Sequence, residues 1–256
     1  MLDLRLGDCL EELKKIPDES VDLVFTDPPY NISGKNKLYR DYRSGKSRDI
    51  SFDFGEWDYD FDPIPFLQEC KRVLRKDGSI IVWTSEQLFP VYRTWFAENM
   101  YPKQLFVWVK ENPVPQFRLC GYRQATELMY WAAKDKIGKN NPNFIFQAQK
   151  EMTNVFYAPI VSGEERTEHP TQKPLSITIQ IIKTHCREGG VVLDPFMGSG
   201  TTGVACKLLN RNFIGIEIDE TYFNISKNRI ACAGVEGVRQ DKAEHKYKYD
   251  IFEGQE

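Results

Sequence analysis

The sequence lacks any apolar run that approaches the roughly 20 residues needed to cross a bilayer. It also begins without the basic and apolar stretches of a secretory signal peptide. We therefore expect a cytoplasmic protein that has no membrane partner. Hydrophobic residues make up 41% and charged residues 28% of the 256 residues, which is typical of one globular domain rather than of a disordered chain.

Cysteine and charge exclude further classes. The six cysteines form no C-x-x-C pair, and only three histidines occur, so the sequence supports neither a disulfide framework nor a metal site. The net charge of −3 gives no attraction of the whole chain to nucleic acid. Any nucleic-acid site must therefore be a local basic patch.

Apolar runs alternate with amphipathic segments along most of the chain. Strands are expected at 2–8, 21–27, 79–85, 103–110, 126–134, 190–194 and 213–219. Helices are expected at 9–16, 62–76, 86–100, 174–186, 201–210 and 220–230, with Gly78 near the end of the second. This alternation predicts an α/β fold with a mostly parallel, doubly wound sheet and a small insertion.

A glycine-rich turn, "VVLDPFMGSGTTG", follows one of the late strands. Its G-x-G-x-x-G spacing matches a dinucleotide fingerprint, but the Asp194 carboxylate precedes it and would repel a pyrophosphate. Val204 stands where a P-loop needs its lysine. A ligand with a sulfonium, an ammonium and a ribose but no phosphate fits better, which favours S-adenosylmethionine, with Glu217 accepting from the ribose hydroxyls. A plain strand-to-helix turn is the alternative.

Four motifs occur in a defined order: "TDPPY" at 26–30, "HPTQKP" at 169–174, "DPFMGSGTT" at 194–202 and "FIGIEIDETYF" at 213–223. Together they resemble the prokaryotic DNA amino-methyltransferases of the β class, which act on adenine N6 or cytosine N4. The resemblance covers most of the chain and implies a Rossmann-like, S-adenosylmethionine-dependent methyltransferase fold in one domain, 1–256. It implies a catalytic half at about 1–110, a variable target-recognition region at 111–168, a cofactor half at about 169–233 and a polar tail at 234–256.

The motif "TDPPY" has a chemical rationale in such an enzyme. An exocyclic amine is a poor nucleophile, and acceptors that hold both its hydrogens free the lone pair for the methyl group. Asp27 supplies one acceptor and the carbonyl of Pro28 the other, while Pro28 and Pro29 make the loop rigid and Tyr30 offers a face for the flipped base. We expect these four residues to be catalytic and to face the glycine loop across one cleft.

The remaining cofactor residues are expected from the same motifs. Asp8 ends the first strand and can accept from the adenine amine or cap the next helix. The resemblance implies that the segment from His169 lines the methionine end, where Lys173 meets the cofactor's carboxylate. The expected cofactor set is Asp8, Cys9, His169, Thr171, Gln172, Lys173, Asp194, Pro195, Phe196, Gly198, Ser199, Gly200, Thr201, Glu217 and Ile218.

Contacts to double-stranded DNA are expected from two polar segments. The basic loop at 31–50, which we expect to be mobile without DNA, carries Lys35, Lys37, Arg40, Arg43, Lys46 and Arg48 beside Tyr39 and Tyr42. Arg118 and Arg123 in the target-recognition region are able to read base edges. A solvated charged surface is the alternative interpretation of the basic loop.

The sequence therefore predicts a DNA methyltransferase specific for adenine N6. Cytosine N4 is the alternative within the family, although members of that type more often carry Ser in place of Asp27. Cytosine C5 is excluded because no Pro-Cys pair is present to supply the nucleophile. An NAD-binding oxidoreductase and a silent DNA-binding relative remain as other classes. The resemblance also suggests a homodimer and a cognate restriction endonuclease as partners.

Overall fold

The computed structural model describes residues 1–30, 61–117, 119–136, 138, 140–169 and 171–234. It also places the backbone of two short paired strands, β3 (Tyr39–Arg40) and β4 (Ser47–Arg48). Among the described residues, no helix is long and apolar enough to cross a membrane.

An eight-stranded sheet forms the centre of the molecule, in the order β1-β10-β9-β2-β5-β7-β6-β8. Its strands are β1 (Leu2–Leu6), β2 (Val21–Thr26), β5 (Leu74–Thr84), β6 (Tyr101–Lys110), β7 (Thr126–Ala133), β8 (Val155–Ala158), β9 (Val191–Asp194) and β10 (Asn212–Glu217). β7 pairs antiparallel with both its neighbours, and the other pairs of this sheet are parallel. The predicted mostly parallel, doubly wound sheet is confirmed.

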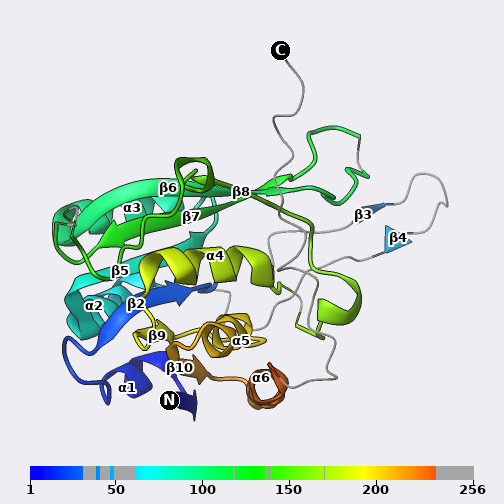
Figure 1. Cartoon of the computed structure of the whole chain (residues 1–256). Helices are drawn as coiled ribbons and strands as arrows, with labels where there is room; N and C mark the ends of the chain where they lie inside the picture. The colour runs from blue at the N-terminus through cyan, green and yellow to red at the C-terminus, as the bar shows by residue number, and fades with distance from the viewer. Residues whose placement is uncertain are drawn as a thin grey trace.

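In the part of the chain that the structure describes, six α-helices cover the two faces of the sheet (Figure 1). They are α1 (Cys9–Leu13), α2 (Pro63–Val73), α3 (Phe89–Asn99), α4 (Leu175–His185), α5 (Thr201–Leu208) and α6 (Glu220–Cys232). The core residues of α1, α2 and α3 form one buried cluster, and those of α4, α5 and α6 form another. The structure therefore has three layers, with helices on both faces of the sheet.

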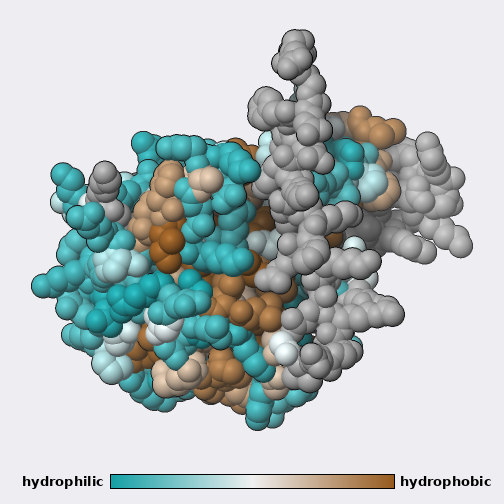
Figure 2. Space-filling view, in the orientation of Figure 1, coloured by the Kyte–Doolittle hydropathy of each residue, from teal (hydrophilic) through white to brown (hydrophobic). Residues whose placement is uncertain are grey.

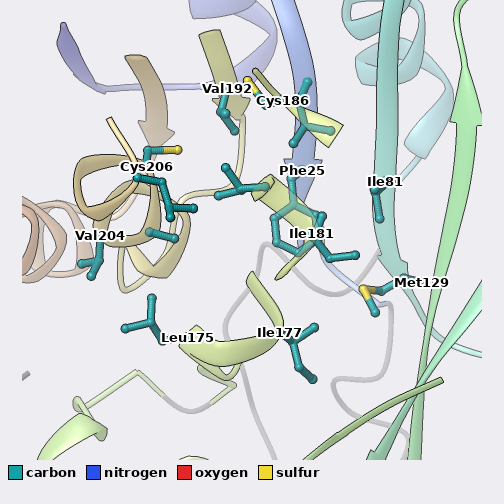
Figure 3. Close-up of a cluster of buried hydrophobic side chains, with 14 of the residues drawn as sticks. Phe25, Ile81, Met129, Leu175, Ile177, Ile181, Cys186, Val192, Val204 and Cys206 are labelled. Carbon is teal, nitrogen blue, oxygen red and sulfur yellow. The ribbon is translucent and has the colours of Figure 1, made fainter. Parts of the chain in front are cut away.

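The cluster under α4 and α5 shows how this packing arises. Phe25 projects from β2 and lies beside Ile181 of α4, while Val204 and Cys206 approach from α5 (Figure 3). The apolar residues of α4 recur at helical spacing, so one face of the helix is buried against the sheet. Burial of these side chains fixes the strand ends that carry the polar loops.

Aspartates begin three of the helices. Asp8, Asp62 and Asp219 each accept a backbone N–H from the first turn of the helix that follows. α2 has Pro63 in its first turn, where the missing N–H costs nothing. These caps satisfy free N–H groups of the first turn and so help to define where the three helices begin.

Some expected boundaries were wrong. Gly78 was expected near the end of a helix, but α2 ends at Val73 and Gly78 lies inside β5. A Cβ at Gly78 would lie 2.9 Å from the backbone oxygen of Asp22 on β2, next to a register shift between the two strands. The glycine is therefore needed for the close approach of β2. β8 was missed because its four residues carry too little periodicity.

The order of the strands reverses between β9 and β2. The strand after β9 along the chain, β10, lies on one side, and the next long strand after β2, β5, lies on the other. Parallel sheets bind ligands beyond the carboxyl ends of the strands at such a switch point. β2 ends at Thr26 and β9 at Asp194, so both predicted acidic loops begin there.

The segment expected to recognise the target, 111–168, lies partly at the carboxyl ends of β2 and β9 and partly at the opposite ends of these strands. Residues 111–125 connect β6 to β7 at the edge where β2 and β9 end. The chain then follows β7 to the opposite edge, where Asn143 donates to the buried carboxylate of Asp22 near the start of β2. The part around Asn143 therefore packs far along β2 from the switch point.

Candidate active site

A pocket of about 620 Å³ lies at the switch point, beyond the carboxyl ends of β2 and β9. It is lined by all four expected catalytic residues and by every expected cofactor residue except Gly200. The two acidic loops thus contribute to one cavity, as the sequence predicted. The volume lies within the ~300–1,000 Å³ that small-molecule sites usually occupy.

The carboxylate of Asp27 lies just beyond the C-terminal end of β2 and accepts two short hydrogen bonds. The Tyr30 hydroxyl donates to Oδ1 at 2.6 Å, and the Lys173 ammonium donates to Oδ2 at 2.6 Å. Burial raises the pKa of Asp27, while Lys173 and Tyr30 oppose this shift by stabilising the ionised carboxylate. Tyr30 was expected to offer its ring to the base, and the structure adds a contact from its hydroxyl to Asp27.

Lys173 also approaches a second carboxylate. Its Nζ lies 3.4 Å from Oε2 of Glu127, whose Oε1 is 2.7 Å from Lys110. Burial by itself would lower the pKa of Lys173, but Asp27 and Glu127 raise it above the ordinary value. Lys173 was expected to meet the carboxylate of the cofactor. That contact stays a prediction, and in the structure the ammonium is paired with these two side chains.

The glycine loop adopts a conformation that larger residues would not allow. Gly198 and Gly200 have φ values of 51° and 80°, which lie in the left-handed region. A Cβ at Gly198 would lie 2.9 Å from Nε2 of His169, and one at Gly200 would lie 2.7 Å from Cβ of Ser226. Gly198 therefore permits His169 to pack against the glycine loop, and Gly200 permits α6 to pack against the start of α5.

Asp194 lies behind this loop with its carboxylate occupied. Oδ1 accepts the Thr26 hydroxyl at 2.7 Å and the backbone N–H of Phe196 at 3.2 Å, and Oδ2 accepts the Thr202 hydroxyl at 2.7 Å. Burial raises its pKa to about 7, against the effect of these donors. The expectation that Asp194 attracts a cationic ligand stays a prediction; in the structure its carboxylate links the loop after β9 to the end of β2 through Thr26.

Glu217 fixes the other side of the glycine loop. Its Oε2 accepts the N–H of Gly198 at 2.7 Å and its Oε1 accepts the N–H of Asp219 at 2.9 Å. The next residue, Ile218, remains 59% exposed although it is a large apolar side chain. Glu217 and Ile218 therefore present a carboxylate and an apolar surface to the same pocket.

His169, Thr171, Gln172 and Lys173 also line the pocket. Gln172 accepts from the N–H and the hydroxyl of Thr167, both at 2.9 Å, and donates to the carbonyl of Glu165 at 2.8 Å. Burial lowers the pKa of His169 to about 4, so its imidazole is neutral at neutral pH. Gln172 thus ties this segment to residues 165–167, while Lys173 contacts Asp27 in the loop after β2.

Asp8 and Cys9 close one end of the pocket. Asp8 Oδ1 accepts the N–H groups of Leu10 and Glu11, which confirms that Asp8 caps α1. Burial raises the pKa of the Cys9 thiol to about 12, so it is no nucleophile at neutral pH.

The expected DNA contacts fall mainly outside the described residues. Lys35, Lys37, Arg43, Lys46 and Arg118 are not described, and only the backbone of Arg40 and Arg48 is placed, in β3 and β4. Arg123 donates to the carbonyl of Pro113 within the loop between β6 and β7. Apolar side chains are exposed on the same loop at Val114, Phe117 and Leu119. Figure 2 shows that hydrophobic and hydrophilic surface alternate over this face of the molecule.

Sequence analysis missed several residues of the site, and three of them bear on its charges and aromatic surfaces. Trp83, at the end of β5, lines the pocket, and Glu127 and Lys110 extend the charge network behind Lys173. Glu127 had a recognisable signal, because a carboxylate in the otherwise apolar strand "TELMYWAA" needs a partner. The partner itself is 46 residues further along the chain and was not evident.

Comparison with known proteins identifies the class to which this fold and site belong. The family model of the DNA methylases, N6_N4_Mtase, matches residues 21–228. The type II methyltransferase M.HinfI of Haemophilus influenzae is 36% identical over 247 residues, which cover 88% of this chain and 67% of that protein. The type II methyltransferase M2.MboI of Moraxella bovis is 31% identical, over 87% of this chain and 85% of that protein. This chain therefore belongs to the DNA methylase family.

Solved structures agree with this assignment. The crystal structure of an M1.HpyAVI–SAM complex superposes with a TM-score of 0.68 at 31% identity and covers 90% of this chain and 100% of that chain. The PvuII DNA methyltransferase, described as cytosine-N4-specific, gives a TM-score of 0.68 at 20% identity over 89% of this chain and 86% of that chain. At that identity the second likeness shows the fold alone.

Proposed function

We propose that this protein is a site-specific DNA methyltransferase that transfers a methyl group from S-adenosylmethionine to the exocyclic N6 amine of adenine. The observation that carries the proposal is the convergence of Asp27 and the glycine loop on one pocket at the switch point. Double-stranded DNA is the proposed substrate. A homodimer and a cognate restriction endonuclease are proposed partners.

The pocket fits S-adenosylmethionine in size and in the chemistry of its walls. Phe196 and the exposed Ile218 offer apolar surfaces for a purine ring, and Glu217 offers acceptor oxygens for a ribose diol. Gly198 lets the imidazole of His169 pack closely against the glycine loop, which a side chain at that position would prevent. When bound, this cofactor supplies an electrophilic methyl group on a sulfonium.

The loop from Asp27 to Tyr30 prepares the target amine. An Asp27 oxygen and the Pro28 carbonyl accept its two hydrogens, which frees the nitrogen lone pair for attack. Pro28 and Pro29 lack N–H groups, so no backbone donor at these two positions competes for the acceptors, and the loop's own contact to Asp27 comes from the Tyr30 hydroxyl. Orientation of the amine by rigid acceptors is then the main source of rate, and no covalent enzyme intermediate is needed.

The target base must leave the duplex to reach this loop, because its amine is otherwise engaged in base pairing. Tyr30 and Trp83 line the same pocket and offer aromatic surfaces to a flipped base. The basic loop, whose side chains lie outside the described residues, is proposed to grip the phosphates nearby.

Adenine is proposed over cytosine because Asp27 occupies the position where cytosine-N4 enzymes more often carry Ser. The chemistry of the loop suits either amine, so the base must be measured. Purified protein should be incubated with S-adenosylmethionine and unmethylated genomic DNA, and the nucleosides analysed by mass spectrometry. N6-methyldeoxyadenosine is expected. N4-methyldeoxycytidine would keep the mechanism and change the base.

A thermal-shift measurement separates the remaining class. S-adenosylmethionine is expected to raise the melting temperature and NAD to leave it unchanged, since a ligand that binds only the native state stabilises it. A shift with NAD alone would favour an oxidoreductase. Cofactor binding without any methylated nucleoside would indicate a silent relative.

A further inference from the structure

The ammonium of Lys173 is enclosed between two carboxylates and two aromatic rings. It lies 2.6 Å from Oδ2 of Asp27 and 3.4 Å from Oε2 of Glu127. The ring centroids of Tyr30 and Trp83 are each 5.2 Å from Nζ. The side chain is only 9% exposed, so this charge depends on protein partners rather than on water.

This arrangement conflicts with binding of a target amine. Oδ1 of Asp27 is occupied by the Tyr30 hydroxyl and Oδ2 by Lys173, so both oxygens already accept short hydrogen bonds. An amine that donates to Asp27 must share an oxygen with one of these groups or displace it. Displacement of Lys173 without another partner would leave an unpaired buried charge, which is strongly unfavourable.

Glu127 provides that other partner. Its Oε1 is held by Lys110 at 2.7 Å, which fixes the orientation of the carboxylate. Its Oε2 is buried and receives no hydrogen bond among the described residues, although Lys173 is within ion-pair distance. Oε2 is thus the longer and weaker of the two carboxylate contacts of the ammonium, 3.4 Å against 2.6 Å to Asp27, and a small movement of Nζ would reverse this order.

We propose that Glu127 is a positioning residue that receives the Lys173 ammonium from Asp27 when the target amine binds. The movement frees Oδ2 for the amine and keeps Lys173 paired. No proton or covalent bond is exchanged between the three side chains. The role rests on the proposed function, because it needs a substrate amine at Asp27.

The test is single-turnover methylation of DNA by Glu127→Gln at saturating DNA and S-adenosylmethionine. The amide keeps the shape of the side chain and removes the charge that attracts Lys173. The rate is expected to fall about tenfold or more, since each factor of ten corresponds to only ~1.4 kcal/mol of barrier. The dissociation constant for S-adenosylmethionine and the melting temperature should stay close to those of the wild type.

Three further variants separate positioning from a structural role. Glu98→Gln makes the same change on the exposed side of α3 and should methylate at the wild-type rate. Glu127→Asp keeps the charge and should recover part of the lost rate. In a Lys173→Gln background, Glu127→Gln should cause little further loss, because the group that it receives is absent.

The outcomes distinguish this inference from the function on which it rests. Wild-type methylation with an unimpaired Glu127→Gln variant would overturn the inference alone. An equal loss of rate from Glu127→Gln with and without Lys173 would also overturn it, because Glu127 would then act independently. A wild-type protein that binds S-adenosylmethionine but methylates no DNA would overturn the proposed function, and the inference with it.

Discussion

The same dipeptide, Asp-Pro, begins the loop after β2 and the loop after β9, yet the two aspartates serve different ends. Asp27 keeps 22% of its side chain exposed and is held by Tyr30 and Lys173. Asp194 is 4% exposed and is surrounded by donors from its own loop and from Thr26. Identical residues at equivalent strand ends thus have different surroundings, with Asp27 proposed as a substrate acceptor and Asp194 joining the two loops.

The neighbouring residues account for this difference. After Asp27, two prolines supply no N–H groups, so its carboxylate accepts from two side chains, Tyr30 and Lys173, and not from the backbone of Pro28 or Pro29. After Asp194, the N–H of Phe196 and the hydroxyl of Thr202 turn back onto the carboxylate. Thr26 joins the two loops, because it precedes Asp27 and donates to Asp194.

Asp27→Ala should give the largest effect, a loss of methyl transfer that Asp27 would cause through substrate and not through stability. Methyl transfer is expected to fall about 10²-fold or more, because a preorganised acceptor at the reacting amine is lost. Binding of S-adenosylmethionine, measured by calorimetry, should be retained. Wild-type turnover by this variant would remove Asp27 from the mechanism.

Asp194→Ala should instead damage the fold around the glycine loop. The hydroxyls of Thr26 and Thr202 and the N–H of Phe196 would lose their common acceptor, at a cost of about 1–3 kcal/mol in the free energy of unfolding. Denaturant unfolding measures this loss, and weaker cofactor binding should accompany it. Loss of turnover with unchanged stability and cofactor binding would show that Asp194, too, acts directly in catalysis.

The pH dependence of the free energy of unfolding should also report on the buried Asp194 carboxylate. Because the folded pKa of Asp194 is raised to about 7 from 3.8, the folded state binds its proton more tightly than the unfolded state. Its contribution to stability is therefore greatest at low pH and declines as pH rises through 7. Between pH 5 and 7 the decline should be roughly 2 kcal/mol.

Asp194→Asn provides the reference for that measurement, because it cannot titrate. The difference in the free energy of unfolding between wild type and variant should change by this amount across the window, while contributions from other groups cancel. A difference that does not vary with pH would show that Asp194 is ionised throughout, contrary to the effect of its burial.

Thr26→Val should give the smallest effect and test the link between the loops. It removes one hydroxyl from the Asp194 carboxylate while keeping the shape of the side chain, so a loss of about 1 kcal/mol of stability is expected. Methyl transfer at saturating substrates should change little. A large drop in rate without loss of stability would mean that the bond to Asp194 also positions Asp27.

Much of this site could be predicted from the sequence because its residues follow strands closely. Asp27 and Asp194 each lie within one residue of a strand end, and parallel strands bring such ends to one edge. Gly78 shows the limit of such patterns, because it was read as a helix end although the approach of β2 requires it inside a strand. Glu127 and Lys110 show another limit, since their contacts depend on an antiparallel pairing that local periodicity does not encode.

The sequence by itself determined the doubly wound sheet, the two acidic loops and the family, because hydrophobic periodicity and short motifs are local properties. The tertiary structure alone decided which donors Asp27 and Asp194 accept from, and which carboxylates pair with Lys173. Those outcomes depend on burial and on distances between residues far apart in the chain, such as Lys173 and Asp27, which meet at 2.6 Å across 146 positions. Electrostatic pairing in a buried pocket is set by these distances, and no local sequence pattern contains them.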